Sequence, residues 1–215
     1  MLYLDIETTT FFQDPHIKAL PRAEQLAAMR FGCAVTATID SAINDHDPSW
    51  QEWQAQEIAG LYEYLVTAKE LVVGWNIIDF DWPVIMENAK RSGVTVLEIE
   101  TEFVEFLDLF HEIRRATGRW YRLEDVAQAN LGRGKLADGQ KAAEWLRSGD
   151  PDLIQKAMEY CRHDVLLTVG LHSILLRGDP LILPPRAARQ ELNEIRWWLD
   201  RHERIPDASG AVSTK

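Results

Sequence analysis

The chain has 215 residues, 46% of them hydrophobic, and a formal net charge of -11 at pH 7. This length and composition are typical of a single α/β domain that buries a sizeable core. The charge argues against a protein that coats nucleic acid non-specifically, although it allows an enzyme whose carboxylates bind metal. No apolar run approaches the roughly 18 residues that span a bilayer, so we expect no contact with a membrane.

The two cysteines, Cys33 and Cys161, are far apart in the sequence and form no C-x-x-C pair. A disulfide framework or a cysteine-based zinc site is therefore not expected, and a reducing cytoplasm is the expected compartment. The chain begins directly on an apolar segment without a basic leader, so we expect no signal peptide.

Strand and helix signals alternate along the chain. Apolar and β-branched runs predict strands at 1–9, 31–39, 71–74 and 103–109, and the prolines within 11–30 indicate a long connection that ends in a short helix. This alternation indicates an α/β fold, a mixed sheet flanked by helices. Apolar residues at helical spacing and fitting helix boundaries predict helices over 53–68, 81–91, 110–116, 123–131, 138–147 and 151–176.

The last part of the chain is expected to lie outside the main domain. Pro184 and Pro185 interrupt the helical pattern, and residues 186–204 predict a final helix. We therefore assign residues 1–180 to the α/β domain, 181–205 to a helical extension and 206–215 to a disordered tail.

The first strand carries two acids, Asp5 and Glu7. Residues two apart on a strand point to the same face, so the two carboxylates are expected to project together. Such proximity is unfavourable unless a cation lies between them. A solvated strand edge would also display acids, but this strand is too apolar for that. The pattern favours one half of a divalent-metal site.

A second group of acids follows the apolar run at 71–74. Asn76, Asp79 and Asp81 lie in the loop between this strand and the next helix, where ligands collect in open α/β sheets. Helix capping explains one aspartate there, but not the whole group.

The third group is Tyr160 and Asp164 in the long helix, where positions four apart share a face. A buried Tyr–Asp hydrogen bond is the structural alternative. Taken together, four carboxylates form the expected cage for two hard divalent cations. Two such ions serve an in-line phosphoryl displacement, in which Tyr160 would orient the attacking water.

Residues 114–141 contain seven Lys or Arg and three acids, an excess of four positive charges within an acidic protein. The sequence leaves open whether this is a phosphate-facing patch or a solvated helix face.

Three motifs together resemble the DEDD superfamily of 3′→5′ exonucleases, which has a ribonuclease H-like fold. Residues 5–8 (DIET) resemble the first motif, and residues 76–81 resemble the N-x-x-x-F-D form of proofreading domains in family-B polymerases. Tyr160-x-x-x-Asp164 matches the third motif in its tyrosine form (DEDDy), because Glu159 occupies the place of the alternative histidine. The motifs are separated by about 70 and about 80 residues, and the resemblance covers residues 1–177.

The resemblance implies a mixed five-stranded sheet and two Mg²⁺ or Mn²⁺ ions. It implies that Asp5, Glu7, Asp81 and Asp164 bind these metals, with Asp81 rather than Asp79 as the ligand because of its register. It further places Thr8, Asn76 and Lys135 near the substrate. The chain departs from the family at Thr9-Thr10-Phe11, where a Thr-Gly turn is common. Asp108 is expected to cap a helix.

The implied activity is removal of nucleotides from the 3′ end of single-stranded nucleic acid, with DNA preferred over RNA because of the second motif. A similar stretch at 131–145 in predicted bacterial exonucleases, some of them attached to helicases, points to a helicase or polymerase partner. The alternatives are an exoribonuclease of the same chemistry and a catalytically idle module that binds nucleic acid or a partner. An endonuclease of the wider ribonuclease H-like group is disfavoured by the third motif.

Overall fold

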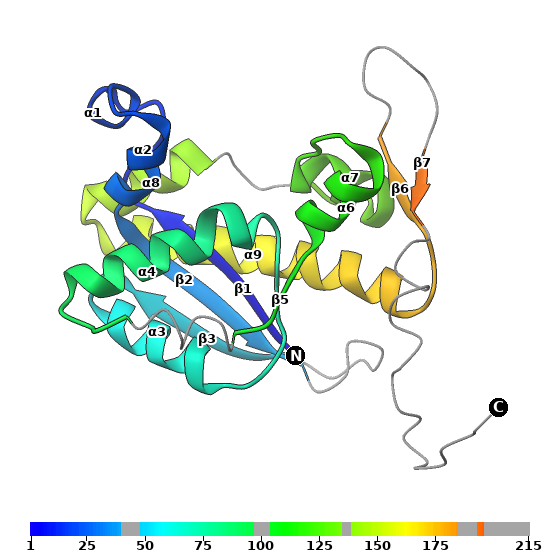
Figure 1. Cartoon of the computed structure of the whole chain (residues 1–215), viewed down its shortest axis with the longest axis horizontal. Coiled ribbons are helices and arrows are strands. Elements are labelled where there is room, and N and C mark those ends of the chain that lie inside the picture. Colours follow the sequence, from blue (N-terminus) through cyan, green and yellow to red (C-terminus); the bar gives the residue numbers. More distant parts are fainter. Residues whose placement is uncertain (40–47, 97–103, 135–138, 185–192, 196–215) are drawn as a thin grey trace.

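A computed structural model of the chain describes residues 1–39, 48–96, 104–134, 139–184 and 193–195 (Figure 1). Its centre is a five-stranded sheet in the order β3-β2-β1-β4-β5. The pairs β1–β2 and β2–β3 are antiparallel, whereas β1–β4 and β4–β5 are parallel. The strands are β1 (Leu2–Thr8), β2 (Phe31–Thr38), β3 (Ser49–Gln54), β4 (Val72–Gly74) and β5 (Phe106–Asp108).

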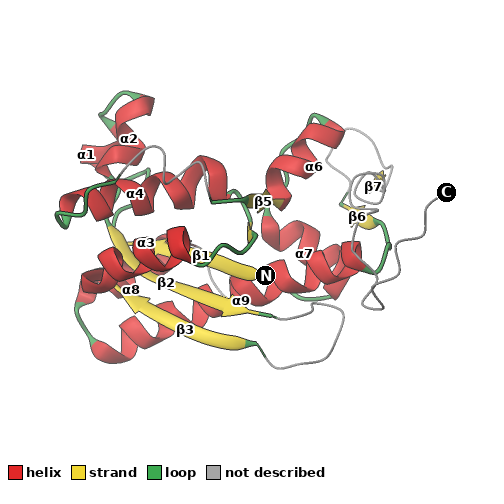
Figure 2. Cartoon of the chain, turned by 60° about the horizontal axis from the view of Figure 1, so that its bottom comes forward, coloured by secondary structure: helices red, strands yellow, loops and turns green. Residues whose placement is uncertain are grey.

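Helices cover both faces of this sheet (Figures 1 and 2). The described α-helices are α1 (Pro15–Lys18), α2 (Arg22–Ala28), α3 (Ile58–Thr67), α4 (Trp82–Arg91), α6 (Leu109–Thr117), α7 (Leu123–Leu131), α8 (Gly139–Ser148) and α9 (Pro151–Leu176). A 3-10 turn (Ala55–Glu57) precedes α3, and a π-helical turn (Ile77–Asp81) precedes α4. A mixed five-stranded sheet with flanking helices was the predicted fold, and it is confirmed.

The alternation of side chains along β1 divides the core into two layers. Leu2, Leu4 and Ile6 pack with α3 and α4 on one face of the sheet. Tyr3 lies on the opposite face, in the layer formed with α6, α7 and α9. Because side chains two apart share a face, Asp5 and Glu7 are on the side of Tyr3 and therefore face α9. The strand thus places two acids against the long helix.

Strand β3 was not predicted, and the helix predicted over residues 53–68 began too early. The helix begins at Ile58, and residues 49–54 pair antiparallel with β2. Only Trp53 is buried in this six-residue strand, so its local sequence carries little strand signal. Pairing with β2 overrides the local preference, as is common for edge strands.

The predicted C-terminal helix over residues 186–204 is wrong at residues 193–195. These residues form β7 (Asn193–Ile195), which pairs antiparallel with β6 (Leu181–Leu183). Leu181 and Leu183 are buried, so their alternation with exposed Ile182 explains the strand that follows α9. The rest of the predicted helix, and the predicted tail at 206–215, lie outside the described residues.

Gly74 ends β4 where the chain turns toward the second acidic loop. A Cβ atom on this glycine would lie 2.9 Å from Ile77 Cβ and 3.3 Å from the Leu4 carbonyl oxygen. We expect Gly74→Ala to lower the free energy of unfolding by about 1–3 kcal/mol, because the added carbon overpacks this turn. Urea denaturation measures the change.

Gly60 provides the matched control, because it is exposed within α3 and its Cβ would lie 3.6 Å from the nearest atom, in the Trp53 ring. Gly60→Ala should raise the free energy of unfolding by about 0.5–1 kcal/mol through helix propensity. If both variants changed stability in the same direction and by the same amount, the close approach at Gly74 would have no consequence.

Candidate metal centre

Strand β1 contributes Asp5 and Glu7 at the middle of the sheet. Asp5 lies opposite Val35 of β2, and Glu7 lies opposite Cys33. The register between β1 and β2 shifts immediately afterwards, between Glu7 and Thr8. Such irregularities change the direction of a strand and are frequent beside active sites. Glu7 is 8% exposed, so its carboxylate is largely removed from water.

Helix α9 contributes Tyr160 and Asp164 from one of its faces, as their spacing predicts. Both side chains are 1% exposed. The helix is attached to β1 by the Cys161 thiol, which donates to the Asp5 carbonyl oxygen at 3.1 Å. Burial raises the pKa of Cys161, and the nearby carboxylates of Asp5 and Glu7 add to the effect. The thiol therefore stays protonated and remains a donor.

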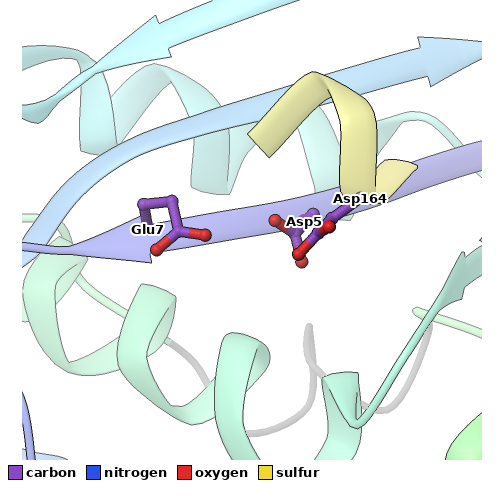
Figure 3. A group of neighbouring side chains, drawn as sticks. All are labelled: Asp5, Glu7 and Asp164. Atoms are coloured by element: carbon purple, nitrogen blue, oxygen red, sulfur yellow. The ribbon is translucent and has the colours of Figure 1, made fainter. Parts of the chain in front are cut away.

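The carboxylates of Asp5, Glu7 and Asp164 converge between β1 and α9 (Figure 3). One oxygen of each residue can be chosen such that all three lie within 4.8 Å of one another. Glu7 and Asp164 are buried and Asp5 is partly buried. Carboxylate oxygens are the ligands that hard divalent cations prefer, and a cation offsets the repulsion among these acids. This acidic cluster can therefore bind a metal ion.

Asp81 reaches the same region from the end of the π-helical turn. Its Oδ1 atom accepts a hydrogen bond from the Ile6 backbone N–H at 3.2 Å, and the residue is 4% exposed. This bond fixes Asp81 beside β1, between the positions of Asp5 and Glu7 along the strand. Asp81 lines the same cavity as the three clustered acids, although it does not belong to the set of three within 4.8 Å.

Asp79, two residues earlier, has a different environment. Its Oδ2 atom lies 2.8 Å from His111 Nε2 and 3.9 Å from Arg114 Nη1, and its side chain is 48% exposed. Asp79 does not line the cavity. The loop therefore presents its two aspartates to different surroundings, and only Asp81 is buried.

Asp108 holds the loop that carries Asn76 and Asp81. Its carboxylate accepts hydrogen bonds from the backbone N–H groups of Asn76 at 2.9 Å, Ile78 at 3.0 Å and His111 at 3.2 Å. The last of these caps α6, as expected from the sequence. The bonds to the neighbouring loop were not predicted. They secure Asn76, which adopts a left-handed backbone conformation with φ 64°.

The acids lie in a cavity of about 380 Å³. Every described residue that the sequence analysis assigned to the site lines this cavity, namely Asp5, Glu7, Thr8, Asn76, Asp81, Tyr160 and Asp164. Thr8 is 7% exposed, and its hydroxyl donates to the Thr10 carbonyl oxygen at 2.6 Å. Lys135 lies outside the described residues. His163 lies outside the cavity lining, and its Nε2 atom is 2.9 Å from the Gly134 carbonyl oxygen.

The cavity also has an aromatic wall that the sequence analysis did not assign. It comprises Phe11, Phe12, Trp75, Phe80, Phe110, Trp120 and Tyr121. Trp75 directly precedes Asn76 and Phe80 directly precedes Asp81, and these adjacencies were signals in the sequence that aromatic residues would lie near the acids. Phe110 and Trp120 lie more than 30 residues after Trp75 in the sequence, and only the pairing of β4 with β5 brings them close to it.

The basic segment at 114–141 is not a uniform patch. Arg115 is paired with Glu112, and Arg114 lies over the Trp120 ring, 4.1 Å from its centroid. Among the Lys and Arg residues that the structure describes, Arg122 alone lines the cavity. Its side chain is 76% exposed and lies 3.2 Å from Glu124. Exposed pairs of this kind are weak, so Arg122 remains available to an anionic ligand.

No described helix combines the length and the apolar composition that are needed to cross a bilayer.

Solved structures with a related fold include a family B DNA polymerase from the hyperthermophilic archaeon Pyrobaculum calidifontis. It matches with a TM-score of 0.60 and 21% identity over 81% of this chain and 24% of the polymerase. The zinc-bound E. coli ExoI–ssDNA complex matches with a TM-score of 0.49 and 17% identity, over 82% of this chain and 40% of that protein. E. coli Exonuclease I with a dA16 oligonucleotide matches with a TM-score of 0.41 and 16% identity over the same shares.

This chain thus spans about a quarter of the polymerase and two-fifths of the exonuclease, and the likeness to the polymerase shows a shared fold. No match was found among curated proteins. The family model described as RNase_H superfamily matches residues 2–176, which include every described residue of the cavity. With this match over most of its length and the mixed sheet 3-2-1-4-5, the chain belongs to the RNase_H superfamily.

Proposed function

We propose that this chain is a metal-dependent 3′→5′ exonuclease of the DEDD superfamily, in its tyrosine subclass. It would hydrolyse phosphodiester bonds at the 3′ end of single-stranded nucleic acid. The observation that carries the proposal is the convergence of Asp5, Glu7 and Asp164, with oxygens within 4.8 Å, in a cavity that Asp81 and Tyr160 also line.

Four carboxylates suit two hard divalent cations, and the proposed cofactor is two Mg²⁺ or two Mn²⁺ ions. Asp5, Glu7 and Asp164 would hold these ions together with Asp81, which lies beside β1 and lines the same cavity. When bound, two such ions stabilise the attacking and leaving oxygens of an in-line displacement. The chain's own contribution is to hold the acids in place: the Cys161 thiol bonds to the Asp5 carbonyl oxygen, and the Ile6 N–H bonds to Asp81.

Tyr160 is proposed to orient the attacking water. Its side chain is 1% exposed, lines the cavity and lies one helical turn from Asp164. A phenol can donate one hydrogen bond and accept another, so it can fix the direction of a water molecule beside a scissile phosphate.

Thr8 and Asn76 are proposed to contact the terminal nucleotide, because both line the cavity beside the acids. Lys135 is kept as a proposed phosphate contact on the strength of the sequence resemblance alone. The proposed preference for DNA over RNA also rests on the sequence resemblance, because the second motif resembles that of proofreading domains. A helicase or polymerase partner is a further proposal from the sequence.

An exoribonuclease would use the same acids, so the alternative differs only in the sugar that the site accepts. A catalytically idle module that binds nucleic acid or a partner is the third reading. The convergence of all five catalytic-type residues on one cavity favours an active enzyme over that module.

The protein is expected to shorten 5′-labelled single-stranded DNA from its 3′ end in the presence of Mg²⁺ or Mn²⁺, and chelation by EDTA should stop the reaction. Asp164→Asn should slow it by about 100-fold or more, because the variant loses a ligand of the metal ions that would stabilise charge at the reacting phosphate. Matched DNA and RNA oligonucleotides, resolved on a denaturing gel, identify the preferred sugar. If neither polymer is degraded with either metal, the proposed activity is wrong.

The two aspartates of the second motif provide a matched pair. Asp81→Asn should slow cleavage by about 100-fold or more and weaken Mn²⁺ binding in calorimetry, since Asp81 lies in the cavity. Asp79→Asn should leave the cleavage rate and the Mn²⁺ affinity within about twofold of the unsubstituted protein, because Asp79 is half-exposed and faces His111 instead. Equal losses in the two variants would contradict the assignment of Asp81 as the ligand.

Tyr160→Phe keeps the aromatic ring and removes only the hydroxyl. We expect kcat to fall by about 10- to 100-fold while KM and Mn²⁺ affinity stay the same, because the water would be misplaced but the acids remain. Steady-state kinetics and calorimetry on the same preparation test this. An unchanged kcat would remove the phenol from the mechanism and leave the metal site as proposed.

A further inference from the structure

Trp120 exposes an unusually large apolar surface. It is 49% exposed, and it is the one aromatic residue among the exposed large hydrophobic side chains of the described residues. It lies in the connection between α6 and α7 and lines the same cavity as the acids. Side chains of this size are usually buried in a core, so an exposed one beside a cavity often marks a binding surface.

Two neighbours hold the Trp120 ring in a defined orientation. The Arg114 guanidinium lies over the ring, 4.1 Å from its centroid, and the Phe110 ring lies 4.9 Å away at an interplanar angle of 54°. Stacked guanidinium groups and tilted aromatic pairs both restrain an indole ring. The exposed ring is therefore a positioned surface.

Aromatic packing continues from Trp120 into the site through Phe110, which is buried. The Phe110 ring is 6.1 Å from the ring of Trp75, which directly precedes Asn76. Trp75, Phe110 and Trp120 thus form a row from the exterior to the second acidic loop, and all three line the cavity with Asp5 and Asp164. We call these three residues the aromatic row.

Arg122 lies beside this row, two residues after Trp120, and lines the same cavity. Its guanidinium can pair with a phosphate, while the neighbouring indole offers a flat apolar face. Alternation of a base plane with a phosphate is the repeating feature of a single nucleic-acid strand, and proteins bind such strands through aromatic stacking beside positive charge.

We propose that the aromatic row is a stacking platform for unpaired bases just upstream of the 3′-terminal nucleotide. Trp120 stacks on a base, Arg122 pairs with an adjacent phosphate, and Arg114 positions the indole. The proposal rests on the proposed function, because it takes the acidic cluster as the place of the scissile phosphate. Bases in a duplex are already stacked and paired, so the platform selects single-stranded ends.

Four substitutions of surface residues separate stacking from general apolar contact. Trp120→Ala removes the ring, Trp120→Leu keeps an apolar side chain without a plane, and Trp120→Phe keeps a plane. Ile182→Ala, at another exposed apolar residue (40% exposed) on β6, is the control for loss of surface area. All four are made in the Asp164→Asn background, so that oligonucleotides remain intact during binding.

Binding is measured by fluorescence anisotropy with 5′-labelled oligodeoxyadenylate of about ten nucleotides, and with a strand of the same length whose bases near the 3′ end are abasic. We expect Trp120→Ala and Trp120→Leu to weaken binding of the intact strand by about 5- to 150-fold, the range for loss of one stacked base. Trp120→Phe and Ile182→Ala should stay within about threefold of the parent. None of the variants should change binding of the abasic strand or of a blunt duplex.

Two results would overturn the platform. One is an unchanged affinity of Trp120→Ala for the intact strand, and the other is an equal loss for the intact and abasic strands, which would mean that Trp120 does not contact bases. Thermal unfolding of each variant shows that the fold is retained. The cleavage assay of the protein with Asp164 intact reports separately on the proposed activity, so a failed platform and a failed exonuclease give different results.

Discussion

The candidate site of this protein depends on a fold that keeps three carboxylates together against their mutual repulsion. Asp5, Glu7 and Asp164 have oxygens within 4.8 Å of one another, and two of the three residues are buried. Such an arrangement requires a rigid frame, and a cation held by the cluster would offset the repulsion. The frame is β1, the central strand of the sheet, and α9, which packs across it. The hydrogen bonds that join them include one from the Cys161 thiol to the Asp5 carbonyl oxygen and one between the Tyr3 hydroxyl and His172 Nδ1 at 2.9 Å.

The parts of the site outside this frame are joined to one another by a further carboxylate, and they reach β1 through its pairing with β4 and through the bond from the Ile6 N–H to Asp81. Asp108 binds three backbone N–H groups, two from the loop after β4 and one at the start of α6. It therefore couples the loop that delivers Asp81 to the helix that carries Phe110. Burial of such a group is tolerated because its oxygens are satisfied by hydrogen bonds, and the residue is 2% exposed. The loop that carries Asp81 and the helix that carries Phe110 are thus held together by a side chain that does not line the cavity.

Periodicity explains why much of this was predictable from sequence. Asp5 and Glu7 share a face because a strand repeats every two residues, and Tyr160 and Asp164 share one because a helix repeats every 3.6. Strand β3 escaped prediction because its signal comes from pairing with β2. The aromatic row escaped for a related reason, since Trp75 and Phe110 meet only through the pairing of β4 and β5. Local pattern reports which face a residue occupies, whereas contacts between distant segments depend on strand order.

The acidity of the chain is compatible with its proposed substrate, because the aromatic row would bind bases and the metal-loaded acidic cluster would bind the scissile phosphate. The net charge of -11 opposes the approach of a polyanion, and Arg122 is the one Lys or Arg among the described residues that line the cavity. For a single strand, the logarithm of the binding constant falls with the logarithm of the salt concentration, with a slope of about 0.7 for each phosphate contact. One such contact therefore provides little electrostatic attraction. Stacking on the aromatic row needs no charge and requires unpaired bases. Metal bound by the acids would then neutralise the cluster where the scissile phosphate has to approach, so attraction is confined to the end of the strand, where an exonuclease acts.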